Sequence, residues 1–226
     1  MIKLGIPTAA QALVSSLGGL VIQFFTNSFG EAAVSANTIV MRADGFVLLP
    51  MMGIGQALTT FVGQNMGAGK PERVTKGINV MNGVIMGIGL LLGCIIFFFG
   101  EPFIHLFLDS SDPNAQAIVE MGTTALKALA FFVWATGFQQ MYIGIMRGAG
   151  AVTVTMIIAL VGMVVRIPLS YFLAVAPNRF VGMYYAMNAA SLTSCVLVYI
   201  YYLSGLWKNK AVVQSAAQAD KKPQSA

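Results

Sequence analysis

Long apolar segments separated by short polar connections dominate this 226-residue chain. We place six of them, at residues 5–27, 38–64, 77–99, 122–146, 152–175 and 182–207. Each is long enough to cross a hydrocarbon core of about 30 Å as a helix. Strands are a poor alternative, because runs such as residues 90–99 do not alternate between apolar and polar positions. The pattern predicts an all-α, polytopic membrane protein, with six transmembrane helices forming one lobe over residues 1–207.

The composition agrees with this prediction, since 57% of the residues are hydrophobic and only 9% are charged. An ordinary soluble domain carries about 25% charged residues. The net charge of +5 comes from short connections and the C-terminal residues, where membrane topology concentrates Lys and Arg, so we expect no nucleic-acid partner. Residues 208–226 are rich in Ala, Gln, Ser and Lys, and we predict a disordered cytoplasmic tail there.

The basic residues also predict an orientation. Lys3, the stretch 70–76, Arg147 and the tail fall on one side of the six-helix topology, whereas the other side holds Arg179, with Lys127 near its boundary. The positive-inside rule places the first side in the cytoplasm. We therefore expect a multi-pass protein of the inner (plasma) membrane with both termini cytoplasmic.

Two glycine patterns predict how the helices end and pack. Gly67 and Gly69 end the second segment, and Gly148 and Gly150 end the fourth, so both Gly-Ala-Gly turns are expected to stop a helix. Pairs of glycines four residues apart allow helices to approach closely. Such pairs are Gly83 with Gly87, Gly89 with Gly93 and Gly144 with Gly148. After the third segment, residues 103–108 are predicted to form a short amphipathic piece at the outer interface.

Charged residues within apolar segments are the first candidates for a functional site, because a central charge costs about 2.5–3.5 kcal/mol on insertion scales. Arg42 and Asp44 are two residues apart and point to different helix faces. Asp44 is therefore a candidate to bind a proton or a cation in a hydrated cavity, and Arg42 is a candidate to line that cavity. The alternative is that both residues lie near the outer interface and extend to it. Arg166 precedes Pro168, and we expect both to be structural, with Arg166 covering the carbonyls that the proline frees.

Polar amides and one aromatic residue form a second candidate set. Gln23 and Asn27 share a helix face, and Gln56 lies in the second segment. Phe132, Thr136, Gln139 and Gln140 form a stripe on the fourth segment. Amide and aromatic groups around a cavity suit a bulky, amphiphilic, often cationic ligand. Hydrogen bonding between helices is the alternative explanation for each of them.

No catalytic constellation or metal-ligand spacing is present in the sequence, so we do not expect an enzyme or a metal cofactor. Cys94 and Cys195 both lie in apolar segments and are expected to be reduced thiols.

An ordered set of motifs resembles the multidrug and toxic compound extrusion (MATE) transporters. The motifs are, in order, Gly5-Ile6-Pro7, Arg42-Ala43-Asp44, the stretch VGQNMGAG at 62–69, Arg147-Gly148-Ala149-Gly150 and Arg166-Ile167-Pro168-Leu169. The chain looks like the C-terminal six-helix lobe of such a transporter. The resemblance implies a twelve-helix, pseudo-symmetric protein that exports drugs or organic cations by alternating access, with protons or sodium as the coupling ion. It also implies a partner for this lobe, either the N-terminal lobe of the same transporter or a second half-size chain.

One departure from the family pattern concerns the coupling ion. Some members carry a cation-binding acid in the middle of the fourth helix of this lobe, where this chain has Thr136. Asp44 matches members that have an acid two residues after the helix-two arginine, and it is the remaining candidate. Two other functions stay open: a flippase of a related fold for lipid-linked sugars or cell-wall precursors, and a truncated membrane protein without transport activity.

Overall fold

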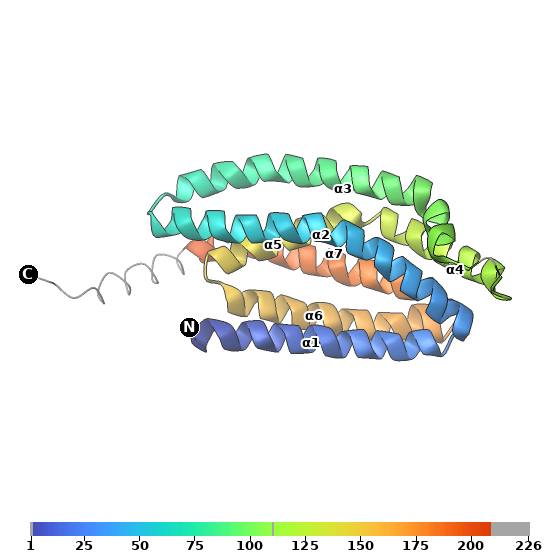
Figure 1. Ribbon diagram of the computed structural model, residues 1–226. Coiled ribbons are helices and arrows are strands. Elements are labelled where there is room, and N and C mark those ends of the chain that lie inside the picture. Colours follow the sequence, from blue (N-terminus) through green and yellow to red (C-terminus); the bar gives the residue numbers. More distant parts are fainter. Residues whose placement is uncertain (1, 110, 209–226) are drawn as a thin grey trace, which may run out of the picture.

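The computed structural model describes residues 2–109 and 111–208, which form an elongated bundle of helices (Figure 1). The elements are α1 (Ile2–Asn27), α2 (Glu31–Gly67), α3 (Pro71–Phe107), α4 (Ala115–Ala130), α5 (Val133–Gly148), α6 (Val152–Ser170), the π-helical segment η1 (Tyr171–Val175) and α7 (Gly182–Leu203). No strand occurs in the described part of the chain, which confirms the predicted all-α class. The predicted disordered tail lies, from residue 209 onward, outside the described residues.

By length and composition, four helical units are able to cross a membrane: α2, α3, α6 with η1, and α7. The pair α4 and α5 adds a fifth unit if the two bent helices count as one span. The first predicted span, at 5–27, is helical as α1 but is not among these units, and its role as a span stays a prediction.

The third predicted segment is longer than the sequence pattern indicated. α3 starts at Pro71, passes through Pro102 and ends at Phe107, so residues 103–107 belong to this helix and do not form a separate interfacial piece. The reason is a tertiary contact, because the fully buried Ile104 packs against Gly122 of α4. That contact holds the last turns of α3 against the bundle, and Leu108 then leaves the helix in an extended conformation.

The fourth predicted segment, 122–146, is two helices. α4 and α5 meet at a bend of 54° around Phe131 and Phe132. At this break the Phe132 N–H donates to the Leu129 carbonyl, with an N···O distance of 2.9 Å, rather than to the Ala128 carbonyl. The Ala128 carbonyl accepts instead from the buried Asn188 amide of α7, at 2.8 Å. A side chain from another helix therefore satisfies the carbonyl that the bend releases.

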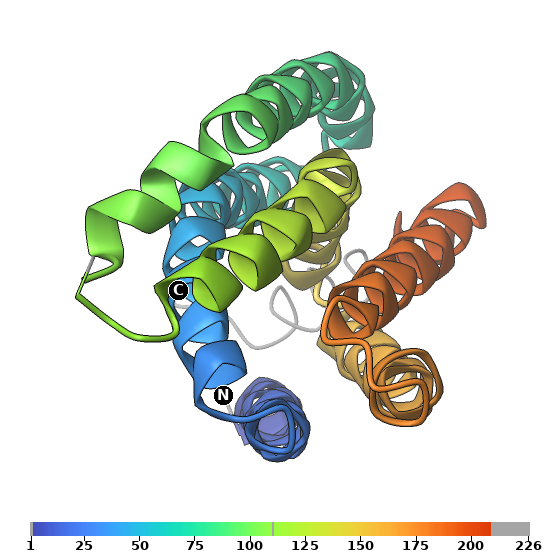
Figure 2. The same ribbon diagram turned by 90° about the vertical axis from the view of Figure 1, so that its right-hand side faces the viewer.

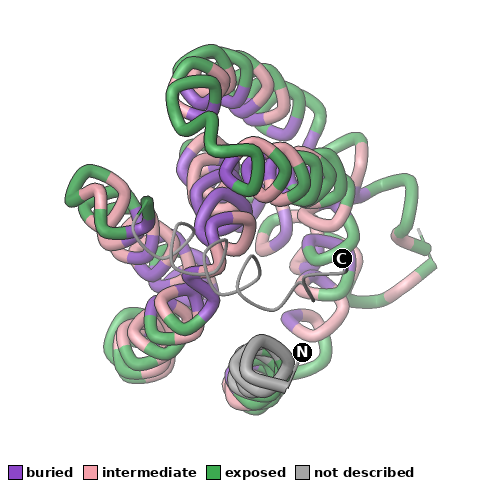
Figure 3. The backbone as a smooth tube through the Cα atoms, turned by 90° about the vertical axis from the view of Figure 1, so that its left-hand side faces the viewer, coloured by how far each residue is buried: buried purple, intermediate pink, exposed green. Residues whose placement is uncertain are grey.

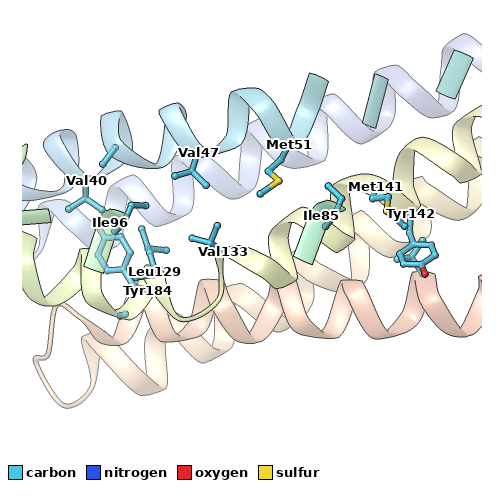
Figure 4. Close-up of a cluster of buried hydrophobic side chains, with 14 of the residues drawn as sticks. Val40, Val47, Met51, Ile85, Ile96, Leu129, Val133, Met141, Tyr142 and Tyr184 are labelled. Carbon is cyan, nitrogen blue, oxygen red and sulfur yellow. The ribbon is translucent and has the colours of Figure 1, made fainter. Parts of the chain in front are cut away.

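The centre of the bundle is the contact between α2 and α5, which is the most extensive contact between two helices. Small residues allow it: Gly144 lies directly on the backbone of Gly55, and Thr59 Oγ1 donates to the Gly144 carbonyl at 3.0 Å. Buried positions concentrate on the inward faces of these central helices, while the outer faces are exposed (Figure 3). Apolar side chains such as Val47, Met51 and Val133 fill the space beside this contact (Figure 4).

Both Gly-Ala-Gly turns end their helices in the same way. Gly69 and Gly150 have φ of +66° and +78°, in the left-handed region that glycine adopts without strain. The N–H of Lys70 donates to the Asn65 carbonyl at 2.9 Å, and that of Ala151 donates to Met146 at 2.8 Å, which is the pattern of a Schellman cap. The two turns lie at the end of the bundle where α1 begins and α7 ends (Figure 1).

The remaining helices leave one side of α5 less tightly covered. α6 packs mainly against α1 and α7, and its contact with α5 is small. In the view along the bundle, α1 and α6 lie on the side of α2 and α5 opposite α3 (Figure 2). Asp44 of α2 and Thr136, Gln139 and Gln140 of α5 line a cavity on the side of the central helices that faces α6.

Candidate functional site

A cavity of about 390 Å³ lies where α2, α5, α6 and α7 face one another, with Gly18 of α1 at its edge. Asp44 of α2 and Arg166 of α6 provide its charged groups. Its other polar groups are Thr136, Gln139 and Gln140 of α5 and Ser191 and Ser194 of α7. The remaining lining is aliphatic or methionine. A concave, mostly apolar site with a few polar groups is the usual form of a small-molecule binding site.

Asp44 is a half-buried carboxylate well inside its helix. The helix starts at Glu31, earlier than the sequence pattern indicated, so Asp44 lies thirteen residues from its start, about 20 Å along the axis. Its interaction with Arg166 is electrostatic and acts across the cavity, since the guanidinium contacts the sulfur of Met187. The carboxylate therefore remains accessible to a small ligand in the cavity.

Arg166 lies between two cavities. Besides the first, it lines a second cavity of about 290 Å³ together with Gln23 of α1, Asn37 of α2 and Tyr184 of α7. Arg166 and Met187 are the residues that both cavities share. Their side chains touch, with Nη2 at 3.7 Å from the Met187 sulfur, so this pair forms the wall between the cavities.

The predicted structural role of Arg166 does not match its contacts. We expected it to cover carbonyls freed by Pro168, but its described contact is with Met187, and its Nε is buried without a hydrogen-bond partner in the described part of the chain. The chain after Pro168 continues into η1, where the Ala176 N–H donates five residues back to Tyr171 at 2.8 Å. The segment that follows the proline thus has the wider spacing of a π-helix.

The structure brings together part of the predicted polar set. Thr136, Gln139 and Gln140 line the cavity with Asp44, and Gln23 lines the neighbouring cavity. The Gln23 amide donates to Asn27 Oδ1 at 3.0 Å, as their shared helix face predicts, but Asn27 is exposed and lines neither cavity.

Three predicted residues lie elsewhere. Arg42 is exposed and its guanidinium lies over the Phe107 ring, 5.1 Å from the ring centroid, so it does not join Asp44. Gln56 is exposed, and Phe132 caps the start of α5 at the helix break. A helix places residues 42 and 44 about 200° apart, which explains why only one of them can face this cavity.

Sequence reasoning missed several residues of the site. Ser191, Ser194 and Met187 line the first cavity, and Asn37 and Tyr184 line the second, where the Tyr184 hydroxyl donates to Asn37 Oδ1 at 2.8 Å. Serine and methionine are common in membrane helices, so the residue types by themselves do not distinguish these positions. The spacing of Met187, Ser191 and Ser194 is that of one helix face, and it is the one signal that was available.

A larger hollow of about 580 Å³ lies between α3 and α4, near Glu101, His105 and Glu120. These three side chains are exposed to solvent, so the protein does not enclose them as it encloses the residues of a binding site. Within the described residues no three His, Cys, Asp or Glu side chains are grouped as a metal site. The Asp44–Arg166 cavity is therefore the better candidate for a site that recognises a ligand.

Comparison with known proteins identifies the family. The MatE family model matches residues 7–172, which is most of the chain and includes Asp44 and Arg166. The chain belongs to the MATE family of transporters. The match ends within η1, so α7, which supplies Ser191 and Ser194, lies beyond the matched region.

Curated relatives of this MATE chain are about twice as long. The probable multidrug resistance protein YpnP of Bacillus subtilis is 34% identical over 92% of this chain, which corresponds to 46% of YpnP. The probable multidrug resistance protein NorM of Thermotoga maritima is 28% identical over 94% of the chain and 45% of its own length. The chain thus spans about half the length of the curated relatives that it matches.

Solved MATE structures share the fold. The MATE transporter ClbM in complex with Rb⁺ has a TM-score of 0.79 at 21% identity, covering 93% of this chain and 49% of ClbM. A MATE transporter in complex with MaD5 also gives a TM-score of 0.79, at 16% identity, over 87% of this chain and 44% of that one. At these identities the likeness concerns the fold, and the match again covers about half of the larger protein.

Proposed function

We propose that this chain is the C-terminal lobe of a secondary active antiporter that exports drugs or organic cations in exchange for protons or sodium. Its family and the multidrug-resistance names of its relatives support the transport of drugs. The observation that carries the proposal is Asp44, a half-buried carboxylate that faces a 390 Å³ cavity with amide and hydroxyl groups on its walls.

The chemistry of Asp44 suits an exchange of cations. One carboxylate binds either a proton, a sodium ion or an organic ammonium group, but it does not bind two of them at full strength. Loading by one cation therefore promotes release of the other, which is the requirement for antiport. Lobes that rock around a site near the middle of the membrane would expose this carboxylate to each side in turn.

The same lining argues against the flippase alternative. A lipid-linked pyrophosphate calls for several cationic side chains, because Arg and Lys are the usual partners of phosphate oxygens. Among the described residues that line the two cavities, Arg166 is the one cation.

The orientation follows from the distribution of basic residues. Lys70, Arg73 and Arg147 lie at the end of the bundle where α1 begins and α7 ends. We propose that this end is cytoplasmic, following the positive-inside rule. Lys70→Cys should then react with a membrane-impermeant maleimide in inside-out vesicles and not in intact cells. Labelling in intact cells would show that this end faces the outside and would contradict the proposed orientation.

Asp44→Asn tests the antiport proposal. We expect gradient-driven efflux of a cationic dye from proteoliposomes containing the chain to fall at least about ten-fold, because the amide binds neither a proton nor a cation as a carboxylate does. Gln56→Glu, an exposed site on the same helix, is the control and should leave efflux unchanged. Equal efflux by Asp44→Asn and the wild type would remove Asp44 from the mechanism. Absence of efflux by the wild-type chain alone would show that this lobe does not transport by itself, which both the need for a second lobe and the truncated-protein alternative predict.

A further inference from the structure

Arg166 carries a charge that its surroundings do not satisfy. A guanidinium has five N–H donors, yet the described contact is with a thioether sulfur, a weak acceptor, at 3.7 Å. Its Nε is buried and has no hydrogen-bond partner within the described residues. Arg166 is half-buried and lines two cavities, and a charge withdrawn from bulk water is costly unless it is paired, so an anionic partner in the cavity favours this guanidinium.

Asp44 is the anionic partner that the structure offers. It lines the same cavity and interacts electrostatically with Arg166. The wall that α5 contributes to this cavity is neutral, because its polar members are a threonine and two glutamines. From α7 the one titratable group that acts on both charges is the Tyr184 hydroxyl, which is engaged with Asn37. Arg166 is therefore the charge that most directly opposes a cation approaching Asp44.

We propose that Arg166 is a tethered cation that competes with free cations for Asp44 and so weakens their binding in this cavity. The proposal rests on the proposed function, because it concerns the same carboxylate. It makes Arg166 a positioning residue that sets affinity and does not touch the transported cation. The benefit is release: an exporter whose site held a cation too tightly would discharge it slowly.

The second cavity explains where Arg166 goes when a cation occupies Asp44. Arg166 already lines that cavity, whose polar groups include the amide of Gln23 and the Asn37–Tyr184 pair. These neutral acceptors offer hydrogen bonds to the guanidinium without adding charge. A side-chain movement past Met187 would thus exchange an ionic partner for neutral ones.

Equilibrium binding to the purified 226-residue chain in nanodiscs tests this inference without requiring transport. The probes are ²²Na⁺ and radiolabelled tetraphenylphosphonium, measured by scintillation proximity at pH 8.5, where protons compete little. Arg166→Gln should tighten the binding of at least one probe about ten-fold or more, and the probe that responds identifies an inorganic or an organic cation. Asp44→Asn should abolish that binding.

Two further variants separate charge from structure. Arg166→Lys keeps the charge and should bind within about three-fold of the wild type, whereas Arg166→Met removes it and should behave as Arg166→Gln does. Arg42→Gln removes an arginine two residues from Asp44 that faces Phe107 instead of the cavity, and it should leave binding unchanged. A misfolded variant cannot bind more tightly, so the expected gain is not produced by structural damage.

Unchanged or weaker binding by folded Arg166→Gln and Arg166→Met would overturn the inference, as would equal tightening by Arg42→Gln. Failure of the chain to bind either cation in any variant would overturn it together with a cation site at Asp44. If efflux depends on Asp44 but removal of Arg166 leaves binding unchanged, only this inference fails. If binding tightens as expected but efflux does not depend on Asp44, the antiport proposal fails and this inference stands.

Discussion

The two halves of α5 differ in what they contact. In the C-terminal half, Gly144 and Gly148 lie against the backbone of Gly55 and Thr59 of α2, with no room for a side chain. In the N-terminal half, Thr136, Gln139 and Gln140 line a cavity toward α6 and α7. Membrane helices associate through close packing because lipid provides little hydrophobic driving force between them. One helix thus combines a dry, rigid contact with a polar, adaptable wall, and the contact holds Asp44 of α2 in place opposite that wall.

The largest expected loss of stability is at the close contact between α2 and α5. Gly144→Leu would force a side chain into the Gly55 backbone, and overpacking costs typically 1–3 kcal/mol and occasionally more. We expect a loss of about 3 kcal/mol, which lowers the melting temperature by roughly 6–12 °C for a chain of this size. The measurement is thermal unfolding of the detergent-purified chain, followed by size-exclusion recovery after heating.

Gly87→Leu provides the control for Gly144→Leu. Gly87 also belongs to a pair of glycines four residues apart, but no atom lies within 4 Å of the position of its missing Cβ. Its melting temperature should change by less than about 2 °C. Equal losses in the two variants would show that the two glycine pairs do not differ in packing.

A smaller loss of stability is expected at the bend where α5 begins. Asn188→Ala removes the buried hydrogen bond to the Ala128 carbonyl at the bend between α4 and α5. An unsatisfied buried acceptor costs about 1–3 kcal/mol, so the melting temperature should fall by roughly 2–12 °C. Thr193→Val, on the same helix, loses only a bond to its own preceding turn at Ala189 and serves as the control. A loss in Thr193→Val as large as in Asn188→Ala would contradict this role of Asn188.

The smallest effect is expected at the cavity wall. Gln139 is half-buried and faces the cavity, so Gln139→Leu adds no overpacking and should change stability by no more than about 0.5 kcal/mol. The same thermal measurement checks it. A loss of stability comparable with that of Gly144→Leu would mean that the polar half of α5 around Gln139 is packed as tightly as the half that contacts α2.

The three glycine pairs show how far a sequence motif predicts packing. The sequence assigns them the same role, yet Gly144 and Gly148 lie against α2, and Gly89 and Gly93 lie against the residues around the α4–α5 bend. At Gly83 and Gly87 an added Cβ would meet no atom of another described helix within 4 Å. The motif shows that a close approach is possible. Whether another helix arrives there depends on the arrangement of the whole bundle.

The two arginines make the same point for the candidate site. Arg42 and Arg166 both interrupt apolar segments, and the sequence favoured Arg42 as a cavity residue and Arg166 as a structural one. The structure places Arg166 in the cavity and Arg42 over Phe107. Nothing local distinguishes them, because each position is decided by other parts of the chain: Arg42 lies over Phe107 of α3, and Arg166 shares its cavity with Asp44 of α2.

The sequence by itself determined the helical class, the family and the Gly-Ala-Gly helix ends, and it singled out Asp44 as a candidate. These depend on hydrophobic runs, on glycine's freedom at positive φ and on the high cost of a charge in an apolar segment, all of which are local. Only the tertiary structure decided the bend between α4 and α5, the full length of α3 and the placement of Asp44 and Arg166 on one cavity. Each of these depends on a partner from a distant helix: Asn188, Gly122 and Arg166.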